Sequence, residues 1–399
     1  MLALLLILLA LFTTTANLTA QNSPVAAKNT ISAVTFKFYE QPVTISYHSN
    51  IRVPFKGEHI AANFEHFFKQ LQVKDTQTLS HSLIWYKKQF NLNDWLFFQL
   101  IYQTVYNIFP KETDTYRTLF MWFVMEAQGY ETQLNYDKND IYLNVFSEKK
   151  VFDNAVIEVP GRGWMVNLSS YLPNIQVSQV VNKPLSSYKR VKNNKPFDFT
   201  LTNLPEFDNC QSVHKAYSFV HDNITYNIDI NYNNQALFVR FKYPAIHLPE
   251  VAKTPLSEEA VTSLKEAFKP LVRNKTNYEA LRLILSFVRS LVYGEDIDKY
   301  HQNNIIFSAE ETLAYQYSDC EDRAILFKHL AKLILNLDVV LLEKDDHVAC
   351  GVAMVNLAGD KIWHNGKAYT YCEPTGPDNH LKPGELPKGY LIQDFKVVE

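Results

Sequence analysis

Cysteine and glycine are both scarce in this chain of 399 residues, and their scarcity excludes several classes of protein. The four cysteines, Cys210, Cys320, Cys350 and Cys372, are too few for a fold held together by disulfides. The 11 glycines form no Gly-rich phosphate-binding loop, and the sequence predicts no cofactor.

A strong charge of one sign is also missing. The net charge of −3 gives no reason to expect nucleic acid or an anionic membrane surface as a partner. Apolar residues make up 47% of the chain, including 23 Tyr and 26 Phe, which is enough for real cores. The length leaves room for two domains.

The first residues have the composition of an export signal. Residues 1–12 are almost purely apolar and 13–21 are small and polar, which predicts a secretory signal peptide, 1–20, cleaved near Ala20. No basic residue precedes the apolar run, which is short for a membrane span. No later run is longer, so the mature chain is predicted to have no transmembrane segment. We therefore expect an exported soluble protein, periplasmic or extracellular.

Hydrophobic periodicity predicts an α+β protein with two domains. The N-terminal α+β domain, 21–175, is expected to hold a hairpin and helices followed by strands: a hairpin over 33–48, helices over 57–71, 80–90, 93–108 and 114–128, and strands over 131–135, 141–146, 155–159 and 164–168. The polar segment 176–199 is predicted as a linker. The second domain, 200–399, is expected to have the same classes of element: a leading hairpin of 225–231 and 236–243, helices over 257–272, 277–292 and 320–335, and strands over 339–343, 347–355 and 368–372.

Three residues of the second domain have the order of a nucleophilic enzyme. Cys320 follows Ser318-Asp319 at the start of a helix, His347 begins a strand, and Glu373 ends another. A helix N-terminus and a nearby imidazolium both lower the pKa of a thiol. His347 is the candidate base, and Glu373 would accept from its other ring nitrogen. The carboxylates at 319, 321 and 322 are expected to cap the helix.

The other two cysteines of this domain lie close to these positions in sequence. If His347 and Glu373 face the site, strand alternation turns Cys350 and Cys372 away from it, both toward one face. There they pack as small apolar residues or approach each other closely enough for a disulfide. A third alternative makes His347, Cys350 and Cys372 zinc ligands, but alternation separates the histidine from both thiols.

The three segments together resemble the transglutaminase-like superfamily. The resemblance rests on Tyr317-Ser318-Asp319-Cys320-Glu321-Asp322-Arg323-Ala324, on His347-Val348-Ala349 and on Tyr371-Cys372-Glu373-Pro374-Thr375, and it covers about 256–376. The segment Glu310-Glu311-Thr312-Leu313 is similar to exported bacterial branches. The resemblance implies a papain-like fold with Cys320 as nucleophile and His347 as base. Glu373 departs from the pattern, because the family has Asp there.

The resemblance implies a Cys-His-Glu cysteine hydrolase or acyltransferase that forms a thioester with a peptide or isopeptide-type amide. Its partner would be a peptide or protein substrate, or a polymer of the cell envelope. Gln316 and the backbone amide of Cys320 are candidate oxyanion donors. The alternative is an inactive relative that binds a peptide or a cell-surface polymer.

The N-terminal half has a similar order of elements. A helix opens at Asp114 and ends at Gly129, and strands follow at Glu131 and Ile141, without a cysteine, a histidine or an Asp-Pro-Thr in the corresponding places. This half is either a degenerate copy of the transglutaminase-like unit or an unrelated α+β domain.

Overall fold

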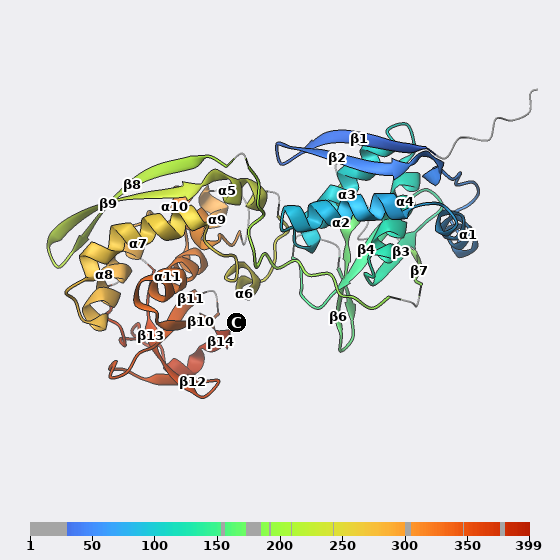
Figure 1. Ribbon diagram of the computed structural model, residues 1–399. Helices are drawn as coiled ribbons and strands as arrows, with labels where there is room; N and C mark the ends of the chain where they lie inside the picture. Colours follow the sequence, from blue (N-terminus) through green and yellow to red (C-terminus); the bar gives the residue numbers. More distant parts are fainter. Residues whose placement is uncertain are drawn as a thin grey trace, which may run out of the picture.

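The computed structural model describes residues 30–152, 156–172, 185–190, 193–208, 210–241, 243–299, 305–345, 347–375 and 380–399. The predicted signal peptide lies outside these residues. The chain forms two lobes side by side, and each lobe combines helices with antiparallel strands (Figure 1). The predicted α+β class is confirmed.

The first lobe places helices between a hairpin and a five-stranded sheet (Figure 1). The hairpin consists of β1 (Ile31–Phe38) and β2 (Gln41–His48). The helices are α1 (Ala61–Gln72), α2 (Gln77–Gln89), α3 (Asp94–Ile108) and α4 (Asp114–Ala127). The sheet contains β3 (Thr132–Tyr136), β4 (Ile141–Ser147), β5 (Val156–Val159), β6 (Gly163–Asn167) and β7 (Ser186–Tyr188).

The second lobe repeats this layout. Its hairpin consists of β8 (Ser212–His221) and β9 (Ile224–Asn233). Its helices are α5 (Asn234–Arg240), α6 (Leu248–Val251), α7 (Glu258–Val272), α8 (Asn277–Arg289), α9 (Asp296–Lys299), α10 (Ala309–Ala314) and α11 (Cys320–Leu335). Its sheet contains β10 (Asp338–Lys344), β11 (His347–Ala353), β12 (Lys361–His364), β13 (Lys367–Cys372) and β14 (Lys396–Val398). Short 3-10 turns complete the chain at Ser49–Ile51, Leu168–Tyr171 and Ile392–Asp394.

The two sheets have the same strand order. The first runs β5-β6-β4-β3-β7 and the second β12-β13-β11-β10-β14, so each strand of the first sheet has a counterpart at the same place in the second. The spacing is also constant: Asp114 and Cys320, Thr132 and Asp338, and Ile141 and His347 each begin an element and lie 206 residues apart. Both α4 and α11 pack on the central strands of their sheets.

Helix α11 shows why this sequence folds as it does around the site. Its inward side chains, including Ala324, Leu326 and Phe327, are fully buried, and the helix packs on β10 and β11. It ends at Asn336, which has a φ of 53° and so adopts the left-handed conformation that closes many helices. The helix therefore has a fixed start, and the residue at that start is Cys320.

Two predicted boundaries were wrong. The hairpin pairs Ser212–His221 with Ile224–Asn233, and residues 236–240, predicted as its second strand, belong to helix α5. The turn is Asp222-Asn223, whose φ values of 47° and 62° fit a two-residue hairpin turn, whereas Asn233-Asn234 joins the strand to α5. Within the predicted linker 176–199, Ser186–Tyr188 forms the edge strand β7, where a polar composition is compatible with a strand.

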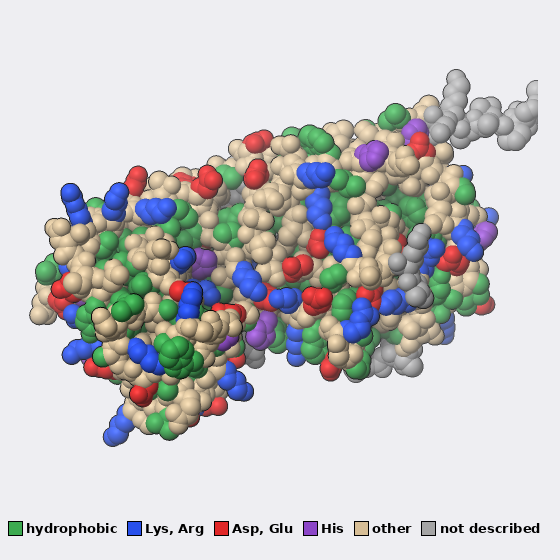
Figure 2. Space-filling view, turned by 60° about the horizontal axis from the view of Figure 1, so that its bottom comes forward, with side chains coloured by type: hydrophobic (Ala, Val, Ile, Leu, Met, Phe, Trp, Pro, Cys, Tyr) green, Lys and Arg blue, Asp and Glu red, His purple; other side chains and the backbone are tan. Residues whose placement is uncertain are grey.

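The lobes meet through backbone and side-chain contacts. Val151 and Ile246 form an antiparallel bridge, and Lys149 forms an ion pair with the buried Glu250. On the face shown in Figure 2, positive and negative side chains are interspersed over both lobes. Within the described part of the chain, no helix combines the length and the apolar character needed to cross a membrane.

Candidate active site

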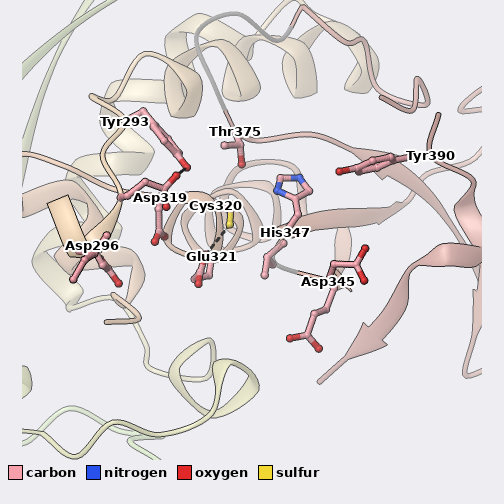
Figure 3. A pocket seen from close by; sticks show the side chains of 13 residues that line it. Tyr293, Asp296, Asp319, Cys320, Glu321, Asp345, His347, Thr375 and Tyr390 are labelled. Carbon is pink, nitrogen blue, oxygen red and sulfur yellow. Dashed lines mark hydrogen bonds between the residues drawn. The ribbon is translucent and has the colours of Figure 1, made fainter. Parts of the chain in front are cut away.

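A cleft of about 580 Å³ opens in the second lobe beside the start of α11. Cys320 and His347 both line this cleft, and the close view in Figure 3 shows the sulfur and the imidazole ring on neighbouring walls. Cys320 is 8% exposed, so the thiol is reached only from the cleft. The structure thus brings together the first two predicted residues, from a helix and from a strand.

The thiol of Cys320 lies in a negative environment. It donates to the Glu321 carboxylate at 2.7 Å, and Asp319 lines the same cleft. Burial, followed by the charge and the hydrogen bond of Glu321, raises the pKa of the Cys320 thiol, while the backbone N–H of Val348 acts in the opposite direction. The expectation that Glu321 only caps the helix was wrong, because its side chain turns to the sulfur.

Asp322 takes the capping role instead. Its carboxylate accepts from the backbone N–H of Asp319 at 3.2 Å and from that of Phe307 at 2.7 Å. Asp322 is fully buried and links the start of α11 to the segment before α10. It therefore fixes the position of the peptide that carries the thiol.

His347 and Glu373 form a hydrogen-bonded pair. The Nε2 atom of His347 lies 2.8 Å from Glu373 Oε2, and Glu373 is 2% exposed. The pair comes from the first residue of β11 and from the residue after β13, strands that are hydrogen-bonded neighbours in the sheet. This contact fixes the imidazole ring and leaves Nδ1 as its other nitrogen. The glutamate side chain thus reaches the ring of His347 from the end of the neighbouring strand.

Glu373 is held in its ionised form. Burial alone would raise its pKa, but hydrogen bonds from His347, from the Tyr371 hydroxyl at 2.5 Å and from the Thr375 N–H at 2.8 Å together lower it. A negative charge at this place stabilises the imidazolium form of His347. The electrostatic requirement for the third member of a triad is therefore met.

Arg289 positions the segment that carries Glu373. Its guanidinium donates to the backbone carbonyl of Glu373 at 2.9 and 2.6 Å and to that of Leu381 at 2.8 Å. Arg289 ends helix α8, more than 80 residues earlier in the chain. Sequence reasoning did not find it, because an arginine in the last turn of an amphipathic helix has the pattern of an ordinary surface residue.

Buried carboxylates anchor the segment before Cys320. Glu310 accepts from the backbone N–H groups of Asn233 at 2.9 Å and Ser257 at 2.7 Å, and Glu311 pairs with Arg240 at 3.1 Å. These contacts tie α10 to the hairpin and to helices α5 and α7. The acidic pair noted in the sequence thus has a structural role.

Cys350 and Cys372 lie side by side on β11 and β13, and both are fully buried free thiols. Their shared face packs against α11, where the Cys350 thiol approaches the Ala324 carbonyl at 3.4 Å. They therefore occupy the core, which is the first of the alternatives drawn from strand alternation. Among the described residues, the groups close enough to share a metal ion are Asp319, Cys320 and Glu321, and not the set that includes His347.

The structure bears differently on the two predicted oxyanion donors, Gln316 and the Cys320 backbone amide. Gln316 is exposed and is not among the described residues that line the cleft. Tyr293 lines the cleft, and Figure 3 shows its ring on the same side as Asp319. Its hydroxyl donates to Glu295, and sequence reasoning did not single it out. The Cys320 backbone amide remains a prediction.

The first lobe has none of this chemistry at the matching positions. Asp114 begins α4, Ile141 begins β4, and Leu168 follows β6 as Glu373 follows β13. Asp114 is bound by Arg117 and by the Tyr106 hydroxyl, both at 2.8 Å, and Ile141 and Leu168 are buried in the core. Comparisons of the chain with protein-family models, with curated proteins and with solved structures found no match.

Proposed function

We propose that the second lobe is a transglutaminase-like cysteine hydrolase or acyltransferase of an exported protein. Its substrate would be a peptide or isopeptide-type amide, and the reaction would pass through a thioester on Cys320. The observation that carries the proposal is the buried, ionised Glu373 bound to His347 in the same cleft as Cys320. We also propose that the first lobe is a degenerate copy of the same unit, which is supported by the shared strand order and the constant spacing.

The chemistry would begin with a proton transfer. His347 takes the thiol proton on Nδ1, and the thiolate attacks the carbonyl carbon of the amide. When the carbon–nitrogen bond breaks, His347 gives the proton to the leaving amine and a thioester remains. Water or an amine then attacks the thioester, His347 accepts its proton, and that proton returns to the sulfur as the acyl group leaves. Glu373 stabilises the imidazolium in both halves.

The acidic environment of the Cys320 thiol favours a second candidate function, a binding protein without catalytic activity. Burial and the adjacent Glu321 raise the pKa of the thiol, which is the opposite of what a resting nucleophile needs. A lobe that keeps the fold but holds its cysteine protonated would bind a peptide or a cell-surface polymer without cleaving it. The two candidates differ in whether His347 can take the proton away from a thiol held by Glu321.

Thiol labelling separates the two. The folded full chain is treated with iodoacetamide at neutral pH, and labelling at each cysteine is followed by mass spectrometry. Cys210 is exposed and is the reference for an ordinary accessible thiol, while the buried Cys350 and Cys372 report on unfolding. An active site predicts that Cys320, although mostly buried, is labelled faster than Cys210. Labelling of Cys320 at or below the Cys210 rate would favour the binding protein.

A further inference from the structure

The cleft beside Cys320 is lined by carboxylates. They come from different elements around its rim and are Glu295, Asp296, Asp319, Glu321, Glu343 and Asp345. Among the described residues that line it there is no lysine or arginine, and His347 is the one basic side chain. Figure 3 shows Asp296 and Asp319 on one side of the sulfur and Asp345 on the other. Acidic side chains therefore surround the nucleophile on both sides.

Asp319 is an unusual member of this set. Its side chain lines the cleft and is 6% exposed, yet its Oδ1 atom has no hydrogen-bond donor within the described structure. A buried carboxylate oxygen without a donor costs free energy that a ligand can recover. Burial and the charges of Glu321 and Asp296 also raise the pKa of Asp319, to about 8. Asp319, whose side chain lines the cleft, thus keeps one oxygen without a described donor, in the residue next to the nucleophile.

The nearby cations are engaged elsewhere. Arg323, on the same helix, donates to the Ser318 hydroxyl at 3.1 Å and to the Leu291 carbonyl at 2.6 Å. Lys344 pairs with Asp345, and that carboxylate is largely exposed.

Two further cations also have other partners. Arg289 donates to the backbone carbonyls of Glu373 and Leu381, and the Lys299 ammonium lies over the Tyr317 ring at 4.9 Å. Of the carboxylates that line the cleft, Asp345 is thus the one with a described lysine or arginine partner.

We propose that the acyl substrate of this cleft carries a fixed positive charge, an ammonium or guanidinium group, within reach of Asp319. The inference rests on the proposed function and names the class of its substrate. The cation would donate to the Asp319 oxygen and be attracted by the surrounding carboxylates, which would place the adjacent carbonyl beside Cys320. Anionic substrates would be excluded by the same charges.

A metal ion is the competing occupant. Asp319, Cys320 and Glu321 bring one ligand atom each within 4.8 Å of one another. However, the cleft has a volume of about 580 Å³, and carboxylates from other elements, such as Asp296 on α9 and Glu343 on β10, line the rest of it. An extended organic cation can contact several of these separated carboxylates, whereas a single metal ion would contact only those of Asp319 and Glu321.

Charged thiol reagents test the proposal without a known substrate. The full chain is treated with methanethiosulfonates that carry a trimethylammonium, a neutral methyl or a sulfonate group. In each case the thiolate forms a mixed disulfide and methanesulfinate leaves. Rates at Cys320 are divided by rates at the exposed Cys210. We expect the cationic reagent to exceed the anionic one at Cys320 by ~10-fold or more after this correction, and added salt to reduce the ratio.

Variants that each lack one carboxylate show which residues cause the charge selectivity at Cys320. Asp319→Asn and Glu321→Gln are expected to lower the ratio toward that of Cys210, whereas Asp229→Asn, which changes an exposed carboxylate on β9, leaves it unchanged. Circular dichroism of each variant confirms that it is folded. Equal corrected rates for the cationic and anionic reagents would overturn the inference but leave the nucleophile in place. No reaction at Cys320 with any reagent would overturn both. Protection of Cys320 by micromolar zinc that EDTA reverses would assign the site to a metal instead.

Discussion

The two lobes have the same strand order, but among the described residues the cysteine, histidine and glutamate proposed for chemistry come together in the second lobe. At the start of the central helix the first lobe has Asp114 and the second Cys320; at the start of the next central strand they have Ile141 and His347. The difference shows that the scaffold forms without a thiol and an imidazole at these two places. In the first lobe Asp114 is half exposed and bound by Arg117, whereas Ile141 is buried in the packed core.

Both lobes have an arginine at the same place in the central helix. Arg117 on α4 and Arg323 on α11 are also 206 residues apart, and each donates to a carbonyl just after an earlier helix, Phe109 after α3 and Leu291 after α8. Because Arg117 makes this contact in the lobe that lacks the proposed catalytic residues at the matching positions, the arginine has a structural role. The comparison thus separates the residues that hold the scaffold from those proposed for chemistry.

The largest effect on the reactivity of Cys320 is expected from substitution of His347, the proposed base. His347→Ala should slow alkylation of Cys320 at neutral pH by ~10²–10³-fold, because the thiol proton loses its acceptor. The matched change Ile141→Ala in the first lobe should leave this rate unchanged and only lower stability. Site-resolved mass spectrometry measures both. A similar slowing in the two variants would mean that His347 acts through folding alone.

The next effect concerns the carboxylate. Glu373→Gln keeps the shape but removes the charge, and it should slow Cys320 alkylation by ~10²-fold, because the imidazolium loses its stabilising partner. Glu373→Asp, which shortens the side chain by one methylene and keeps the charge, tests whether a shorter carboxylate still reaches His347. Recovery of much of the rate would indicate that either carboxylate can contact His347. No loss with Gln would contradict the ion-pair role of Glu373.

The shared arginine should act on stability. Arg323→Met removes the fully buried donor to the Leu291 carbonyl and should lower the free energy of unfolding by about 2 kcal/mol. Arg117→Met should act in the same direction and by a smaller amount, since its partner Asp114 is half exposed. The free energies of unfolding of the two variants are measured by urea titration followed by circular dichroism. If the Arg323→Met variant keeps its stability but the reactivity of Cys320 changes, Arg323 acts on the thiol and does not only hold the scaffold.

A substitution of Glu321 is expected to have a smaller effect on the reactivity of Cys320, and to increase it. Its negative charge raises the pKa of the Cys320 thiol, so Glu321→Gln should lower that pKa. More thiolate is then present at a given pH, and alkylation at pH 8 should become ~10-fold faster. The measurement is the pH profile of labelling, which should move to lower pH. An unchanged profile would show that burial alone controls the thiol.

The smallest effect is a pH dependence of stability. The pKa of Asp319 is raised to about 8, so the folded state binds a proton more tightly than the unfolded state between about pH 4 and 8. Stability contributed by this group therefore falls as pH rises through that range. Asp319→Asn should remove the loss and gain about 1 kcal/mol at pH 8 but not at pH 4.

The control for this prediction is in the first lobe. Thr113 stands where the second lobe has Asp319, and its hydroxyl accepts from the Tyr116 N–H as an ordinary helix cap. Thr113→Ala should lower stability equally at both pH values. Equal gains for Asp319→Asn at pH 4 and pH 8, measured by thermal unfolding, would contradict the raised pKa.

Local patterns predicted the elements well where periodicity was strong. Residues 320–335 were predicted as a helix with the bounds that the structure gives to α11, because a polar start and a buried apolar face both lie within the segment. The true hairpin was missed although Asp222-Asn223 lies between two alternating runs. The edge strand β7 was missed because a short polar strand has no buried face of its own to detect.

The residues proposed for the site could be named from the sequence, but the electrostatics around them could not. Cys320, His347 and Glu373 were found from their places at the ends of elements, and the structure places Glu373 against His347. The direction of the Glu321 side chain and the reach of Arg289 were not predictable, because both depend on rotamers and on contacts between distant segments. These contacts set the pKa of the thiol and hold the carboxylate in place.

The register of β10 and β11 has a consequence for engineering. Lys344 pairs with His347, so the base is the first residue after a tight turn in which Asp345 has a φ of 51°. Surface turns usually accept inserted residues. Here one added residue on the β11 side would shift that strand by one step and turn the imidazole to the opposite face. Insertion scanning should therefore find this exposed turn as intolerant as the core, while the Asp222-Asn223 turn accepts a tag.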